Sequence, residues 1–337
     1  MVTYIIRRLI GALLMLAVVS MVTFSIFFVV PRLAGVTATD FANRYVGRAA
    51  TQETVVAVAN KLGLNDPVVV QYARWIKGIF VGAEYDYGAG VEHCPAPCFG
   101  YSFVTKNPVW PDLVDRMPVT LSLAAGASVI WLLAGVAVGV LSALKRGSIF
   151  DRTAMVIALS GVSLPPFFTG LIALSLFSYG LRITAPGGAY TPLTENPAEW
   201  AYSLILPWLT LAFLNAAAYA RLTRAGMLET MGEDYIRTAR AKGLRESTVI
   251  TKHGLRAALT PIVTIFGLDV GILLGGAILT ENVFSLPGLG KYATQAISTQ
   301  DLPKIMGFTM LAAFFIVMAN LIVDLLYAVV DPRVRLT

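Results

Sequence analysis

Six long runs of apolar residues divide the chain, and polar segments of very different lengths separate them. The runs occupy residues 9–30, 119–144, 153–179, 203–219, 259–279 and 305–330. A helix needs about 20 apolar residues to cross about 30 Å of hydrocarbon, and the runs cluster around that length. The alternating ten-residue segments typical of membrane β-barrels are absent from the sequence. The pattern predicts an all-α polytopic membrane protein with about six transmembrane helices.

Composition supports a membrane protein. Of 337 residues, 56% are hydrophobic and 14% charged, and the mean hydropathy is +0.70. The net charge of +6 comes from cations gathered at the edges of the apolar runs, which topology explains without a nucleic-acid partner. Two Cys and two His are too few for a haem-ligating or metal-rich site, so no metal site is predicted.

The distribution of cations predicts the orientation of the chain. Arg7 and Arg8 precede the first run, and Arg333 and Arg335 follow the last. By the positive-inside rule, both termini are expected in the cytoplasm. The first run lacks an Ala-x-Ala-like cleavage site and is expected to remain as a span.

The longest polar segment of the second half, residues 221–260, carries eight Lys and Arg and is therefore also expected in the cytoplasm. Glu233 precedes Arg237 by four residues, the favourable order for an intrahelical ion pair. Tyr235, Ala239 and Gly243 would share one face, and Gly243 is a plausible helix end. The segment is predicted to be a short, exposed, cationic helix that docks on a partner. The alternative is an ordinary loop whose charges only set topology.

Residues 33–117 form the main soluble insertion, expected outside the cell between the first two spans. Thr51 begins a segment that could cap a helix. Residues 68–80 are amphipathic, with apolar Tyr72, Trp75, Ile76 and Phe80. The predicted domain organisation is an N-terminal transmembrane helix at 1–32, the insertion at 33–117, and a core of five spans at 118–337, which contains the cationic loop 221–258.

Cys94 and Cys98 lie in this insertion with two prolines between them. An extracytoplasmic compartment permits a disulfide, which we expect here. The alternative is a metal or redox site that uses the adjacent His93.

Residues 235–244 read YIRTARAKGL, and residues 253–261 read HGLRAALTP. This stretch resembles the EAA loop of ABC-importer permeases, specifically the DppB/OppB branch for dipeptides and oligopeptides. Arg237, Thr238 and Ala239 stand where the general motif has Glu-Ala-Ala, and Gly243 matches its glycine. The missing Glu and the longer gap to Pro261 are departures typical of the peptide branch.

Further segments resemble the same family and extend the match over nearly the whole chain. They are SLPPFF at 163–168, ENVFSLPGLG at 281–290, NLIVDLLY at 320–327, DPRVR at 331–335, FGYSF at 99–103 and RMPVTL at 116–121. The resemblance is weakest over residues 33–97.

The resemblance implies a type I ABC importer permease fold. It also implies a second, DppC/OppC-like permease subunit, two ATP-binding subunits of the DppD/DppF or OppD/OppF kind, and an extracytoplasmic substrate-binding protein. Residues that would couple to the ATPase are Glu233, Asp234, Tyr235, Arg237, Thr238, Ala239, Lys242, Gly243 and Leu244. ATP and Mg would be held by the partner ATPases.

The sequence lacks the Gly-x-x-x-x-Gly-Lys-Ser/Thr motif, so this chain is not expected to be an ATPase or to carry a cofactor. Nickel, glutathione and haem are alternative substrates, because permeases for them share these loops. A self-sufficient secondary transporter is a different class, and it would show inverted repeats and paired broken helices.

Two acidic residues and a proline pair fall inside predicted spans. Asp269 could line the pathway or form a hydrogen bond across helices, and Asp324 is expected to cap or pair near the cytoplasmic edge. Pro165 and Pro166, followed by Phe167, should kink the third span. The kink could shape or gate a cavity, or serve packing alone.

Overall fold

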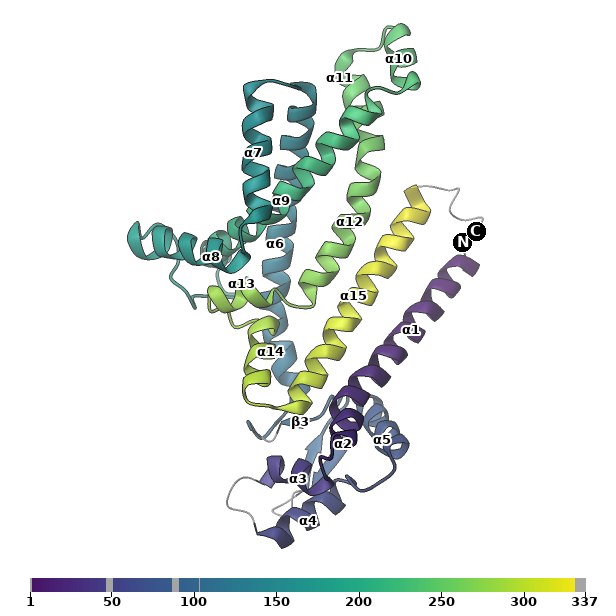
Figure 1. Ribbon diagram of the computed structural model, residues 1–337, viewed down its shortest axis with the longest axis vertical. Helices are drawn as coiled ribbons and strands as arrows, with labels where there is room; N and C mark the ends of the chain where they lie inside the picture. Colours follow the sequence, from purple (N-terminus) through teal and green to yellow (C-terminus); the bar gives the residue numbers. More distant parts are fainter. Residues whose placement is uncertain (1, 47–50, 87–90, 103, 331–337) are drawn as a thin grey trace. The chain divides into compact units, whose positions relative to one another are not determined.

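The computed structural model describes residues 2–46, 51–86, 91–102 and 104–330, which are mostly helical (Figure 1). Phe103 and the 331–335 motif, with the basic C-terminal residues, lie outside this part. Five helical segments are long and apolar enough to span a membrane, and a bent helix pair makes up to six. They are Tyr4–Leu33, Val109–Leu144, Pro197–Thr230, Glu246–Leu274 and Leu302–Leu325. The predicted class, an all-α polytopic membrane protein, is confirmed.

One compact unit comprises residues 1–118 and 289–317. Helix α1 (Val2–Phe24) continues through a π-helical turn, Ser25–Val29, into α2 (Val30–Leu33). Helices α3 (Ala38–Val46) and α4 (Gln52–Lys61) follow, and they bury Phe41, Val55 and Val58 in one cluster. Thr51 caps α4 by accepting from the Thr54 amide, as predicted.

The same unit holds α5 (Val68–Val81) and two small antiparallel sheets. β1 (Ala83–Asp86) pairs with β2 (Val91–Cys94), and β3 (Tyr101–Ser102) with β4 (Asn107–Pro108). The first residues of α6 (Val109–Leu144) pack with α14 (Leu289–Ser298) and the start of α15 (Leu302–Val330). Arg116 stacks over the Tyr292 ring there, at 4.8 Å.

The other unit comprises residues 119–288 together with the end of the chain from 318. Its core is aromatic and aliphatic, with Trp131, Leu204, Tyr219 and Ile262 buried. Helices α6 and α9 (Pro197–Thr230) approach each other closely along glycines. A Cβ at Gly126 would lie 2.1 Å from the Trp208 ring, and one at Gly139 would lie 2.5 Å from Thr223. Small residues are what permits such approach between membrane helices.

Helix α9 is longer than the fourth apolar run suggests. Asn196 caps its start, and the helix continues through Pro207 to Thr230. Arg221 and Arg224 therefore extend the span instead of belonging to a loop. The non-spanning part of the 221–260 segment is correspondingly shorter than expected.

The third apolar run is two helices, not one span from 153 to 179. α7 (Ile149–Ser163) and α8 (Pro166–Ala173), which a π-helical segment extends to Gly180, meet at 106°. A proline forces the residue before it out of helical geometry, and Leu164 and Pro165 both have ψ near that of a strand, at 132° and 135°. With 15 residues, α7 is about 22 Å long, shorter than the hydrocarbon it would have to cross alone.

Directly after the fifth span, the first residues of the 281–290 segment are helical. α12 (Arg256–Leu274) ends before Gly275 and Gly276, and α13 (Ile278–Val283) begins directly after them. Glu281 in α13 is fully buried and accepts a hydrogen bond from Thr120 Oγ1 at 2.7 Å. The paired carboxylate shows that α13 packs against α6.

The contact between α6 and α9 yields a stability prediction. Gly126→Val should lower the free energy of unfolding by about 1–3 kcal/mol, because the new side chain collides with Trp208. Thermal unfolding in detergent measures the change. Gly11→Val is the matched control, since a Cβ there meets nothing within 4 Å; equal losses in the two variants would contradict the close packing.

Candidate functional site

The most distinctive polar feature of the second unit is helix α10 (Asp234–Ala241), which follows the end of α9. Glu233 is its N-cap, with extended φ and ψ of −69° and 151°. Asp234 lies in the first turn and Arg240 in the last, the favourable order for a helix dipole. Arg237 Nη1 pairs with Asp234 Oδ1 at 3.3 Å, so the predicted Glu233–Arg237 pair is wrong. Glu233 is the N-cap, and the Arg237 side chain turns instead to Asp234 in the first turn.

One face of α10 is buried on its own chain. Ile236 and Ala239 pack with Val249 and Met231. Ala239 was predicted on the docking face with Tyr235 and Gly243, and this is wrong because it is buried. The three-residue spacing places Ala239 beside Ile236 on the inward side.

The other face of α10 and the turn after it are exposed. The exposed members of the predicted coupling set are Glu233, Asp234, Tyr235, Arg237, Thr238, Lys242, Gly243 and Leu244. Tyr235 and Leu244 add apolar surface to this charged face, with 46% and 42% of their area exposed. The face therefore offers both apolar and charged contacts.

Gly243 ends α10 as the sequence predicted. Its φ is +73°, its amide donates to the Arg240 carbonyl, and the Leu244 amide donates to the Ala239 carbonyl. These two bonds define a Schellman motif, which satisfies carbonyls at the helix end. A Cβ at Gly243 would meet nothing within 4 Å, so conformation, not crowding within the chain, favours glycine here.

A bidentate ion pair fixes the next turn. Arg240 Nη2 and Nε contact the two carboxylate oxygens of Glu246 at 2.7 and 3.1 Å. Glu246 opens the short helix α11 (Glu246–Thr248), which continues through a π-helical segment, Val249–Leu255, into α12. The pair therefore closes the turn between α10 and α11.

Buried contacts join α10 to the ends of three spans. Met231, which touches the α10 cluster, also borders a second cluster formed by Ala143 of α6, Met227 of α9 and Ala258 of α12. A Cβ at Gly254 would lie 2.9 Å from Met231 Sδ, so a glycine is needed at this crossing. Displacement of α10 thus has a packed route into the spans.

An ion pair near the same end ties α7 to α9, and the sequence analysis missed it. Arg224 Nε and Nη2 contact the two oxygens of Asp151 at 2.6 and 2.8 Å, and the Gly147 amide also donates to Asp151. Asp151 is buried. The sequence marks Asp151 as unusual, because it is the one acid in the cationic turn at 145–152. The sequence does not reveal its partner, which lies 73 residues away.

Within the spans, Tyr219 Oη donates to Asp269 Oδ2 at 2.7 Å, which joins α9 to α12. Of the two roles predicted for Asp269, a hydrogen bond across helices is confirmed, and lining the pathway stays a prediction. Pro165, Pro166 and Phe167 are exposed at the 106° bend. Their gating role and the role of Asp324 also stay predictions.

In the first unit, Cys94 and Cys98 form the predicted disulfide. The pairing leaves no thiolate for the alternative metal site beside His93. No cluster of three metal-ligating side chains occurs in the part of the chain that the structure describes.

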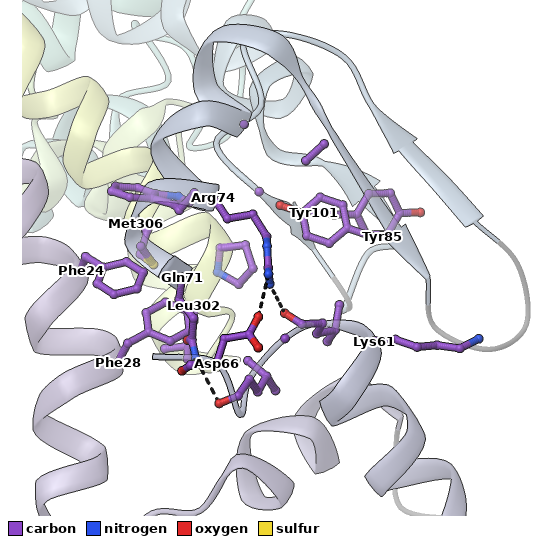
Figure 2. A pocket seen from close by; sticks show the side chains of 18 of the residues that line it. Phe24, Phe28, Lys61, Asp66, Gln71, Arg74, Tyr85, Tyr101, Leu302 and Met306 are labelled. Atoms are coloured by element: carbon purple, nitrogen blue, oxygen red, sulfur yellow. Dashed lines mark hydrogen bonds and ion pairs between the residues drawn. The ribbon is translucent and has the colours of Figure 1, made fainter. Parts of the chain in front are cut away.

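This unit also contains a cavity of about 350 Å³ between α1, α4, α5, the β1 strand and the start of α15. Phe24 of α1 and Phe28 of the following π-helical turn form one wall, and Leu302 and Met306 another (Figure 2). Arg74 at the cavity pairs with Asp66 at 2.6 Å. Burial raises the pKa of Tyr85, another lining residue, to about 12, so its phenol keeps its proton.

These features define a polytopic helical membrane protein that presents a short charged helix from the ends of its spans. Residues 135–336 match the family described as "Binding-protein-dependent transport system inner membrane component", and residues 1–124 match the N-terminal component of such systems. The chain belongs to this family.

Relatives extend the match over the full length. A putative peptide transport system permease protein of Brucella abortus is 38% identical, covering 99% of each chain. The dipeptide transport system permease protein DppB of Escherichia coli K12 is also 38% identical, covering 91% of this chain and 96% of its own. The resemblance to DppB/OppB-type ABC permeases is confirmed. This class is a membrane permease subunit and not a self-sufficient secondary transporter.

The buried face of α10 can be tested directly. Ile236→Ala should lower the free energy that holds α10 on its own chain by about 2–5 kcal/mol, because it opens a cavity against Val249 and Met231. Amides of residues 234–248 should then exchange with deuterium faster, while those of the spans keep their protection. The control is Leu244→Ala on the exposed side; unchanged exchange in Ile236→Ala would contradict the anchoring.

The Arg224–Asp151 pair gives a second test. Asp151→Asn should lower the unfolding temperature because it leaves the Arg224 guanidinium without its charge partner. The double variant Asp151→Asn, Arg224→Gln should recover part of that loss, as a double-mutant cycle would show. Additive losses would mean that the two side chains do not interact.

Proposed function

We propose that this chain forms half of the translocation pathway of an ATP-driven importer for dipeptides or oligopeptides. The names of its full-length relatives support a peptide substrate. The observation that carries the proposal is α10: a charged, exposed helix whose opposite face packs on Val249 and Met231, and Met231 in turn borders residues of α6, α9 and α12. A helix that transmits movement from an ATPase subunit to the spans needs both an exposed docking face and a face packed on its own chain.

In this proposal α10 inserts into a groove on an ATP-hydrolysing partner, the helix-in-groove mode of recognition. Asp234, Tyr235, Arg237, Thr238 and Leu244 make the contact, and Ile236 and Ala239 hold the helix on its own chain. The partner supplies ATP, Mg and hydrolysis, since the sequence carries no phosphate-binding loop.

Closure of the ATPase pair would displace α10, and the Met231 contacts would pass the movement to α9 and α12. The Arg224–Asp151 pair would carry α7 along with α9. The bend at Pro165 and Pro166 is then the natural place for the pathway to open and close, with Phe167 beside it.

The assembly proposed around this chain is heteromeric. It contains a DppC/OppC-like permease subunit, two DppD/DppF-like or OppD/OppF-like ATPases and an extracytoplasmic binding protein that delivers substrate. The chain crosses the inner or plasma membrane several times with both termini in the cytoplasm, in keeping with Arg7 and Arg8 before the first span.

Gly243 offers a test of coupling. Gly243→Trp should assemble normally but separate ATP hydrolysis from uptake, because it adds bulk to the docking face and strain at φ +73°. Gly243→Asn should keep most of the activity, since asparagine tolerates left-handed geometry. Both rates are measured in vesicles that contain the whole importer. Normal coupled uptake by Gly243→Trp would contradict docking at this turn.

Competition for uptake tests the substrate. Vesicles with the importer and its binding protein should take up labelled dipeptide, and unlabelled di- and oligopeptides should compete. Competition by nickel, glutathione or haem, with none by peptides, would assign one of those substrates instead and leave the coupling role of α10 in place.

A further inference from the structure

Helix α5 has two apolar faces, and only one of them is covered by the chain. Gln71 and Gly78 are buried, and Tyr72 and Trp75 are partly buried beside them. On the opposite side, Val69, Phe80 and Val81 leave 77%, 76% and 68% of their surface exposed. Val70 and Ala73 are exposed on the same side.

The exposed residues form a stripe along the helix. At 100° per residue, Val69, Ala73 and Phe80 lie within about 40° of one another. Between Val69 and Phe80 the stripe is about 16 Å long. Lys77 is the one charged residue within it, and a lysine stem can lie along apolar surface while its ammonium group reaches water. A continuous apolar stripe of this kind marks an interaction surface.

The covered face of α5 fixes its position along α1. Tyr72 Oη lies 2.7 Å from Ser20 Oγ, and the Phe24 ring lies 5.4 Å from the Tyr72 ring and 5.9 Å from Trp75. Figure 1 shows α5 beside the end of α1 at which the chain leaves the span. The contacts join α5 to α1 itself and not to a loop above it.

Ser20 and Phe24 lie within Tyr4–Leu33, a stretch long and apolar enough to span a membrane. Ser20 precedes Val30 by ten residues, which is about 15 Å of helix. That is about half of the hydrocarbon thickness. A helix in contact with Ser20 and Phe24 therefore lies beside the C-terminal half of this apolar stretch.

The first apolar stretch, Tyr4–Leu33, also exposes apolar side chains near its contact with α5. Ile26 and Val30 of that segment are more than half exposed, as are Met21 and Val22. In a membrane these exposed side chains would meet acyl chains, and α5 packs against the same helix. A lipid bilayer would cover both of these apolar surfaces at once.

We propose that α5 is an interfacial helix whose Val69–Phe80 face is immersed in the leaflet at the C-terminal end of α1, the outer leaflet in the orientation proposed above. Lys77 lies at lipid phosphate level. Amphipathic helices of this kind sink about 5–10 Å into the boundary between headgroups and acyl chains. The helix then holds the insertion domain at a fixed height relative to the membrane.

Spin-label accessibility tests the proposal in the assembled importer in lipid nanodiscs. The chain's two cysteines form a disulfide, so Phe80→Cys or Val69→Cys provides the one thiol on this chain that a nitroxide reagent can label. Oxygen concentrates in acyl chains, whereas a charge-neutral nickel chelate stays in water. The ratio of the two collision rates therefore reports immersion.

The ratio at positions 69 and 80 should approach that of Leu13→Cys, an exposed site of α1, and exceed several-fold that of Val56→Cys, an exposed site of α4. A ratio equal to that of Val56→Cys would place the stripe in water and overturn the proposal. Low collision rates with both reagents would also overturn it, because they would show a protein covering α5. Neither result would affect the role proposed for α10.

Discussion

The packing of Met231 is the contact on which the rest of this structure depends. On one side it touches the cluster that buries Ile236 and Ala239 of α10, and on the other it borders Met227 and Ala258. Gly254 leaves the space for this crossing. Close-packed interiors transmit displacement because they contain few voids to absorb it. A helix tethered by a loose loop would move without moving the spans.

Charge is used differently on the two sides of α10. The exposed pairs Arg237–Asp234 and Arg240–Glu246 shape the surface and the turn, and water screens them. The Arg224–Asp151 pair is bidentate and its carboxylate is buried, so it links α7 firmly to α9. Farther along, Tyr219 and Asp269 join α9 to α12. The bend between α7 and α8 contains neither of these contacts. Two prolines there leave backbone groups without helical hydrogen bonds.

The sequence was informative where the cause of structure is local. Apolar run length set the spans, Gly243 ended its helix, Thr51 capped another, and Cys94 met Cys98. It failed where the cause is distant. The partner of Asp151, the burial of Glu281 and the inward direction of Ala239 depend on which helices lie side by side. The proline pair predicted a kink but not its angle, because the angle depends on the helices that pack against α8. The exposed stripe of α5 shows the same limit: periodicity marked residues 68–80 as amphipathic but not which apolar side chains the protein leaves uncovered.

The central claim is that a motor subunit receives α10, and site-directed cross-linking tests it most directly. A thiol-reactive photoprobe on Tyr235→Cys, in a transport-competent importer, should capture an ATP-hydrolysing subunit with a yield that changes when ATP is bound. The same probe on Arg221→Cys, an exposed position on α9, should give little product. If Tyr235→Cys captures no ATP-hydrolysing subunit, or if both positions capture it equally and independently of nucleotide, α10 is not the coupling element.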